Sequence, residues 1–307
     1  MKARAVLAGV GAVAALAMTG CGSSNDASDD PSTGAATVSV VASTDVWGDV
    51  VAQIAGDLTG STVQITSIIT DPDADPHSYE ANTQNQLALS KASLVVENGG
   101  GYDDFVDTML KTAGSSPTVL NAVDISGKTA PAGGELNEHV WYDFPTVQKV
   151  AAQITDALST ADAADASTFQ ANEQAFDQKL AAMEQTESSI KSAHAGEGAA
   201  ITEPVPLYLL EACGLVNKTP GEFSEAIEEG TDVSASVLKE TEDLFTDHEV
   251  KVLAYNEQTS GPETEAVLKA AKANDIAVVP VTETLPEGKD YLTWMQSNLA
   301  ALQSALG

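Results

Sequence analysis

The chain has 307 residues, 43% of them apolar, and acidic residues outnumber basic ones by 45 to 14, which gives a formal net charge of −31. This length is sufficient for two globular lobes, each with its own core. The negative charge repels nucleic acid and anionic lipid headgroups and attracts cations. We therefore exclude nucleic acid as a partner, although an excess of acidic residues also serves solubility alone.

The first residues have the form of a secretory signal. Lys2 and Arg4 precede an apolar run that ends near Met18 and is too short for a comfortable membrane span. The sequence MTGC that follows resembles a lipobox, in which cleavage leaves a cysteine that carries lipid. We predict a lipoprotein signal peptide over 1–21, ending at lipidated Cys21, and a disordered tether over 22–37. The mature protein is then extracytoplasmic and lipid-anchored to the outer face of the cell membrane; a plain secretory signal is the alternative.

Runs of β-branched residues alternate with helical patterns from Val38 onward. In chain order, strands and helices are expected in turn at 38–44, 46–56, 63–69, 83–92, 93–99, 103–113 and 117–123. This alternation predicts a mostly parallel sheet flanked by helices. We assign residues 38–165 to an N-terminal α/β lobe.

The middle of the chain has a different pattern. Residues 166–193 contain no glycine or proline, and large apolar residues recur at spacings of 7, 4, 3 and 7 from Phe169 to Ile190. This is one face of a long helix, roughly 40 Å in length. We predict a linking helix over 166–195.

The strand–helix alternation then resumes. Strands are expected at 199–205, 250–257 and 276–283, and helices at 207–214, 234–245, 263–274 and 290–306. Residues 196–307 are therefore predicted to form a C-terminal α/β lobe. The predicted fold class is α/β, with two lobes, each a mostly parallel sheet flanked by helices, joined by one long linking helix.

Several potential metal ligands follow the predicted strands. His77 lies in DPDADPHSYE, after the strand at 63–69, and His139 lies in NEHVWYD. In the C-terminal lobe, the strand segments 199–202, 250–256 and 276–282 lead directly into Glu203, Glu257 and Glu283. Because ligands bind beyond the carboxyl ends of strands in open α/β sheets, these residues could meet at a metal site. The alternative is that they are solvated histidines and surface or helix-capping glutamates.

The sequence contains none of the common motifs of metalloproteases, zinc fingers, nucleotide-binding proteins or serine hydrolases. The pattern HExxH, zinc-finger spacing, GxGxxG, the P-loop and GxSxG are all absent. Cys213 is expected to be a buried small hydrophobe, and acylation of Cys21 would leave it without a disulfide partner. His194 and His248 are interpreted as solvated surface residues.

Two motifs resemble the signatures of a known family. DPHSYE is similar to D-P-H-x-Y-E, and NEHVWYDF is similar to N-P-H-x-W-x-D-P with Glu138 and Phe144 in place of the prolines. The family is the metal-receptor lipoproteins, the solute-binding proteins of bacterial manganese and zinc ABC importers. SLVVENGGGYDDF, TEPVPLYLLEACGL and VTETL resemble further segments of that family, so the resemblance extends from Val38 to Leu306.

The resemblance implies a monomeric receptor, not an enzyme, that binds a divalent metal ion between its lobes and delivers it to an ABC importer permease. The implied ligands are His77, His139, Glu203 and Glu283. Glutamate at position 203 is usual in manganese receptors, whereas zinc receptors usually have histidine there. ISGKTAPAGGEL also lacks the histidine-rich loop of many zinc receptors.

The implied ligands, two imidazoles and two carboxylates, also favour manganese, because oxygen-rich sites suit hard cations. Mn²⁺ is therefore favoured as the transported ion. Zn²⁺ is the alternative, since zinc binds nearly any such site more tightly than manganese. A different class is a metallohydrolase built on the same His/Glu cluster, which would need an open coordination position and a base such as Glu257. A surface adhesin or structural lipoprotein without a metal function is a third hypothesis.

Overall fold

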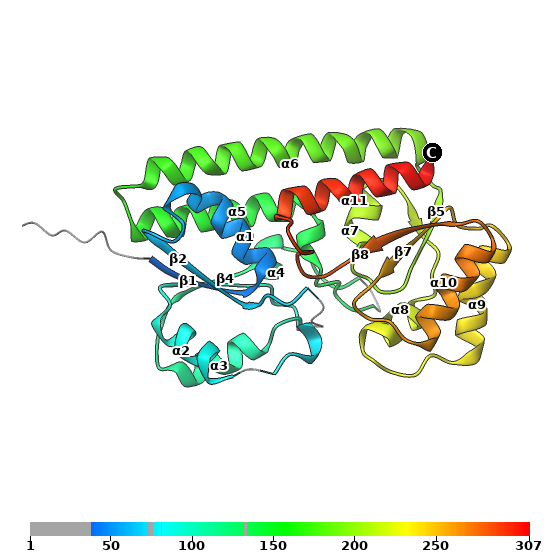
Figure 1. Ribbon diagram of the computed structural model, residues 1–307, viewed down its shortest axis with the longest axis horizontal. Coiled ribbons are helices and arrows are strands. Elements are labelled where there is room, and N and C mark those ends of the chain that lie inside the picture. The colour runs from blue at the N-terminus through cyan, green and yellow to red at the C-terminus, as the bar shows by residue number, and fades with distance from the viewer. Residues whose placement is uncertain (1–37, 73–75, 81, 132–133) are drawn as a thin grey trace, which may run out of the picture. The chain divides into compact units, whose positions relative to one another are not determined.

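A computed structural model describes residues 38–72, 76–80, 82–131 and 134–307 (Figure 1). The predicted signal peptide, Cys21 and the tether over 22–37 lie outside the described residues. The described residues all belong to one compact unit. Among them, no helix combines the length and apolar character needed to cross a bilayer.

The first sheet contains four parallel strands in the order β2-β1-β3-β4. Their bounds are Val38–Thr44 for β1, Val63–Ile69 for β2, Leu94–Glu97 for β3 and Thr118–Asn121 for β4. Its helices are α1 (Asp45–Ala55), α2 (Thr83–Lys91), α3 (Phe105–Ala113), α4 (Ala122–Ser126) and α5 (Phe144–Ala161), with 3₁₀ turns η1 (Gly56–Leu58), η2 (Pro76–Ser78) and η3 (Val140–Tyr142). Successive side chains of β1 point to opposite faces, so Val40 packs towards α1 and α5, and Val41 packs towards α2 and α3.

The second sheet also contains four parallel strands, in the order β6-β5-β7-β8. Their bounds are Gly198–Ile201 for β5, Val216–Asn217 for β6, Val252–Asn256 for β7 and Ala277–Val281 for β8. Its helices are α7 (Leu207–Ala212), α8 (Gly221–Glu228), α9 (Ala235–Thr246), α10 (Pro262–Ala273) and α11 (Tyr291–Leu306). Leu253 packs with α9 and α10 on one face, and Ala254 packs with α11 on the other.

Local sequence explains where several helices begin. The side chains of Asn82, Asp143 and Asp290 each accept a hydrogen bond from a backbone N–H in the first turn of α2, α5 and α11. Such caps satisfy donors that have no partner within the helix. In α11, Thr293 completes a reciprocal capping box with Asp290.

The linking helix α6 spans Ala166–His194, and it runs alongside helices of both sheets (Figure 1). It contacts α1 and α5 from the first sheet region and α7 and α11 from the second. Its buried face carries Phe169, Phe176, Leu180, Met183, Glu187 and Ile190. The apolar members of this face belong to one hydrophobic cluster that includes strands of both sheets. The two sheets are therefore joined by a continuous core.

The predicted fold class is confirmed, including the long helix. The observed strands β3, β4, β5, β7 and β8 are shorter than predicted, and the helix α5 and the short elements α4, β6 and α8 were not predicted. The division of the chain at 165 and 195 remains a prediction. Cys213 is buried and His248 is exposed, as expected, whereas His194 is partly buried with Nδ1 3.3 Å from Oε2 of Glu197.

Candidate metal site

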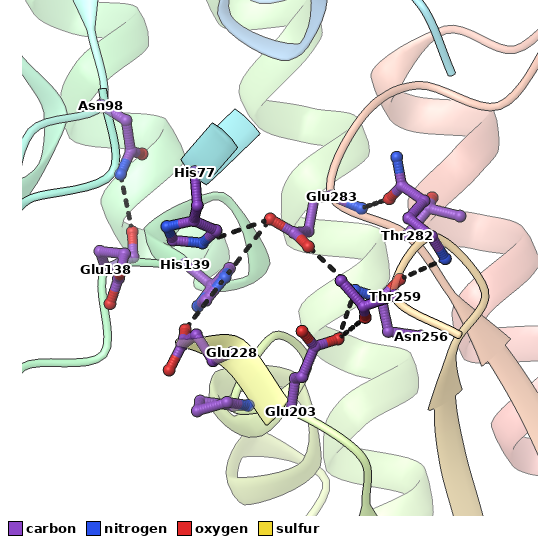
Figure 2. A network of polar contacts seen from close by, with 12 residues as sticks. His77, Asn98, Glu138, His139, Glu203, Glu228, Asn256, Thr259, Thr282 and Glu283 are labelled. Atoms are coloured by element: carbon purple, nitrogen blue, oxygen red, sulfur yellow. Dashed lines mark hydrogen bonds and ion pairs between the residues drawn. The ribbon is translucent and has the colours of Figure 1, made fainter. Parts of the chain in front are cut away.

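Three of the four predicted ligands lie beyond the carboxyl ends of strands, and His139 lies in the segment between α4 and η3 (Figure 2). His77 lies on η2, beyond β2, and His139 directly precedes η3. Glu203 and Glu283 each lie two residues beyond a strand, β5 and β8 respectively. The side chains of His139 and Glu283 are 0% and 1% exposed, whereas that of His77 is 25% exposed. One histidine is therefore accessible to solvent and the other is fully enclosed.

Both histidines face one oxygen of Glu283. Oε2 of Glu283 lies 3.7 Å from Nε2 of His77 and 3.8 Å from Nε2 of His139. These separations exceed hydrogen-bond distance, and neither His139 Nε2 nor Glu283 Oε2 has a hydrogen-bond partner despite its burial. Buried polar atoms without a partner are rare and require an explanation such as an ion. The three side chains thus direct ligand atoms towards a common space.

Asn137 orients the ring of His139. Its Oδ1 accepts a hydrogen bond from the backbone N–H of His139 at 3.1 Å and lies 2.7 Å from ring atom Nδ1. Its Nδ2 donates to the carbonyl oxygen of Pro204, which fixes the orientation of the amide. Nδ1 of His139 must then carry the proton, and Nε2 of the neutral ring presents its lone pair to the site. Asn98 also donates to the carbonyl oxygen of Glu138, which ties this segment to the end of β3 (Figure 2).

Glu203 joins the same network through an amide. Asn256, the last residue of β7, donates from Nδ2 to Oε2 of Glu203 at 2.6 Å and to Oε1 of Glu283 at 2.9 Å. The hydroxyl of Thr259 also donates to Oε2 of Glu203. Glu203 is therefore held beside the site by Asn256 and Thr259, one step further from the histidines than Glu283 (Figure 2).

Glu228 is a carboxylate of the site that the sequence reasoning missed. Its Oε1 lies 3.7 Å from Nε2 of His139, and its side chain is 16% exposed. One ligand atom from each of His77, His139 and Glu228 lies within 4.8 Å of the others. The sequence does carry a signal: glutamates occupy the last turn of α8, where the helix dipole disfavours negative charge. Glu257, in contrast, is exposed and lies outside this group.

The site contains more carboxylates than positive charge can balance. Burial alone would lower the pKa of His139, but Glu283, Glu138 and Glu228 outweigh burial and raise that pKa to about 9. Burial, and then repulsion from Glu283, raises the pKa of Glu203 to about 7. Burial raises the pKa of Glu228 to about 8, with attraction to His139 opposing it. An electrostatic field of this sign favours a cation.

Aromatic rings enclose the histidines on the side of the first sheet. Ring centroids of Tyr102 lie 5.0 Å from His77 and 5.8 Å from His139, and the Trp141 centroid lies 5.1 Å from His139. Tyr102 and Trp141 are 2% and 1% exposed. This wall excludes water from one side of the site, which strengthens electrostatic interactions within it.

Gln258 connects elements on both sides of the site. Its Nε2 donates to the carbonyl oxygen of Pro72 at 2.8 Å, and its Oε1 accepts from the backbone N–H of Glu283. The hydroxyl of Thr284 also donates to the Pro72 carbonyl, at 3.3 Å. Pro72 precedes the turn that carries His77, so these bonds set the position of that turn relative to Glu283.

In chemical terms, the site combines two imidazole nitrogens with carboxylate oxygens. Imidazole suits zinc, copper, iron and nickel, and carboxylates add affinity for harder cations such as manganese. The donor types therefore fit a divalent transition-metal ion as a bound substrate.

Comparisons with known proteins agree with this chemistry. The family model described as "ZnuA: Zinc-uptake complex component A periplasmic" matches residues 40–305. The iron-binding protein YfeA of Yersinia pestis is 26% identical over 125 residues, 40% of each chain. The manganese-binding lipoprotein MntA of Halalkalibacterium halodurans is 27% identical over 111 residues, 36% of this chain and 37% of MntA. The matched region thus spans about two fifths of the length of these curated relatives.

A solved structure gives the same architecture. A mutant of the laminin-binding adhesin Lmb from Streptococcus agalactiae matches with a TM-score of 0.73 at 20% identity, and the match covers 88% of this chain and 100% of that one. At this identity the likeness establishes the fold. The family model covers more of this chain than the alignments with the curated relatives do, since it extends from the first strand to the last helix. On this evidence the chain belongs to the ZnuA family.

Proposed function

We propose that this protein is an extracytoplasmic receptor that binds a divalent transition-metal ion and delivers it to the permease of an ABC importer. The proposed ligands are His77, His139, Glu203 and Glu283. One observation carries the proposal: Nε2 of His139 and Oε2 of Glu283 are buried without hydrogen-bond partners and lie 3.8 Å apart. A cation bound there would compensate both atoms and would also be within reach of His77. Membership of the family supports the role in uptake.

We favour Mn²⁺ as the transported ion. The related proteins and the family are named for three different metals, iron, manganese and zinc, so the names do not decide between them. The donor set contains two imidazoles and at least two carboxylates, and oxygen ligands favour manganese more than a histidine-rich set would. A zinc receptor is the alternative, because zinc binds such donors more tightly in solution.

We further propose that the protein acts as a monomer and that lipid on Cys21 anchors it to the membrane. MntA, one of the relatives, is named a lipoprotein. The anchor would keep a loaded receptor within reach of its permease, because the sixteen residues of the predicted tether span roughly 20–25 Å on average.

A metallohydrolase is less well supported than a receptor. Hydrolysis requires an open coordination position on the metal and a base beside the attacking water. Glu257, the base that a hydrolase would need, is exposed, whereas Glu228 and Glu283 lie 3.7 and 3.8 Å from Nε2 of His139. In this proposal the carboxylates beside the histidines serve as ligands, which leaves no base for an attacking water.

The test is calorimetric titration of residues 36–307 after removal of metal with a chelator. Mn²⁺ and Zn²⁺ are titrated separately, and the measurement is repeated with Glu203→His and with the control Glu257→Gln. We expect one ion per chain with submicromolar affinity for Mn²⁺, a shift of preference towards Zn²⁺ in Glu203→His, and no change in Glu257→Gln. Tight Zn²⁺ binding without Mn²⁺ binding would identify a zinc receptor. If no divalent ion binds or raises the melting temperature, the proposed function is wrong.

A further inference from the structure

We infer that Glu228, at the C-terminal end of α8, is an additional metal ligand of this site and raises its coordination number above four. The inference rests on the proposed function, since it concerns the same bound ion. It adds a carboxylate from a helix that supplies none of the four proposed ligands, His77, His139, Glu203 and Glu283.

The geometry of Glu228 fits a ligand. Nitrogen and carboxylate ligands lie about 2.0–2.2 Å from a transition-metal ion, so two ligands of one ion are about 3–4 Å apart. Oε1 of Glu228 is 3.7 Å from Nε2 of His139, and ligand atoms of Glu228, His139 and His77 all lie within 4.8 Å of one another. These three side chains could share one ion after small rotamer adjustments.

The surroundings of Glu228 give it no other evident role. Its Oε1 is buried without a hydrogen-bond partner, and so is the facing Nε2 of His139, whose side chain is fully enclosed. The carboxylate also lies at the negative end of the α8 dipole and near three further carboxylates, Glu138, Glu203 and Glu283. Each of these features destabilises a negative charge. A divalent cation would compensate all of them at once.

Glu228 also lies where the site meets solvent. Two cavities of about 590 and 580 Å³ are both lined by His77 and Glu228. His139 and Glu283 are fully or almost fully buried, so an incoming hydrated cation would meet Glu228 and His77 first. The carboxylate of Glu228 would replace one water ligand of the ion before the enclosed ligands bind.

A fifth protein ligand has a consequence for selectivity. Zinc sites are mostly tetrahedral, whereas manganese accepts larger, oxygen-rich coordination shells. With Glu228 the donor set becomes two imidazoles and three carboxylates. We therefore expect removal of this carboxylate to weaken Mn²⁺ binding more than Zn²⁺ binding.

The experiment compares Glu228→Gln with Glu229→Gln in the metal-free protein. Glu229 is the adjacent, exposed residue, so both changes replace one carboxyl group with an amide at the same place on the chain. Mn²⁺ and Zn²⁺ affinities are measured by calorimetry, and the number of nitrogen and oxygen neighbours of bound Mn²⁺ is measured by X-ray absorption. We expect Glu228→Gln to lower Mn²⁺ affinity at least tenfold, to lower Zn²⁺ affinity by less, and to alter the Mn²⁺ coordination shell. Glu229→Gln should change none of these.

The outcomes separate this inference from the proposed function. If the unmodified protein binds Mn²⁺ and Glu228→Gln binds it equally well with an unchanged coordination shell, Glu228 is not a ligand and the receptor role stands. If the unmodified protein binds neither ion, both proposals fall. Misfolding would not mimic the expected result, because replacing a buried, unpartnered carboxyl group with a neutral amide of the same shape should leave the metal-free variant at least as stable to heat as the unmodified protein.

Discussion

Asn137 contacts His139 twice and the opposite side of the site once. Its Oδ1 lies 3.1 Å from the backbone nitrogen and 2.7 Å from Nδ1 of His139, while its Nδ2 donates to the carbonyl oxygen of Pro204. The same amide therefore sets the tautomer of the ring and ties it to the segment that carries Glu203.

We expect Asn137→Ala to weaken metal binding by about 10- to 100-fold, the range found when a group that orients a ligating histidine is removed. Asn137→Asp should lose less, because it keeps an acceptor for Nδ1 and loses only the donor to Pro204. Calorimetry with Mn²⁺ measures both variants. Equal affinity in Asn137→Ala and the unmodified protein would contradict an orienting role.

Gln258 should control how long the ion stays bound. Gln258→Ala removes the bonds to Pro72 and to the backbone of Glu283, and two hydrogen bonds of about 0.5–1.5 kcal/mol each correspond to roughly tenfold or more in rate or affinity. We expect metal to dissociate about tenfold faster into excess chelator, measured by stopped flow. Glu257→Gln serves as the control next to it. A dissociation rate unchanged by Gln258→Ala would mean that the turn carrying His77 is held by other contacts.

Glu187, on the linking helix, should make stability depend on pH. It lies on the buried face of α6, and burial, followed by repulsion from Glu184 and Asp143, raises its pKa from 4.5 to about 8. Because the folded state holds this proton more tightly than the unfolded state, the contribution to stability is complete below pH 4.5 and is lost as the pH rises towards 8.

Glu187→Gln removes this loss because the amide stays neutral. We expect the variant to match the unmodified protein near pH 5 and to exceed its free energy of unfolding by on the order of 2 kcal/mol at pH 9. Urea denaturation at the two pH values provides the measurement. The exposed Glu240 on α9 provides the control Glu240→Gln, which should show no such pH dependence. A parallel pH profile for Glu187→Gln and the unmodified protein would argue against a raised pKa.

Gly198 allows a close approach between β5 and the chain before β7. A Cβ at this position would lie 2.1 Å from the carbonyl oxygen of Glu249, which is a backbone atom and cannot rotate away. We expect Gly198→Ala to lower stability by about 1–3 kcal/mol, the usual range for overpacking. Gly221→Ala is the matched control, because the nearest atom there is 3.5 Å away on the side chain of Glu225. Thermal unfolding of the two variants should differ clearly.

The fold was predictable because its signals are long and repeated. Residues 166–193 carry an uninterrupted apolar stripe without glycine or proline, and the observed helix Ala166–His194 extends it by one residue. The strand β6 has two residues and α8 has eight, and neither length provides a usable period. Their positions follow from packing between distant parts of the chain.

The site was predictable only in part. The motifs around His77 and His139 identified both histidines, and the structure places them near Glu283. At the end of β7 the sequence drew attention to Glu257, but the buried residue is Asn256, one position earlier. Every residue of β7 is buried, and Glu257 is the first residue beyond the strand, so the offset of one residue exchanges the buried strand end for an exposed loop residue. Glu228 could not be placed without α8.

The aromatic rings around His139 give the proposed metal site a fluorescence signal. The indole of Trp141 lies 5.1 Å from the imidazole of His139, within the range over which a bound paramagnetic ion quenches emission. The chain has two other tryptophans, Trp47 and Trp294, and replacing both with phenylalanine would leave Trp141 as the sole indole. Bound Mn²⁺ would then quench the fluorescence of this indole, whereas diamagnetic Zn²⁺ would not. The protein thus contains its own optical probe, which can distinguish the two ions during a single competition experiment.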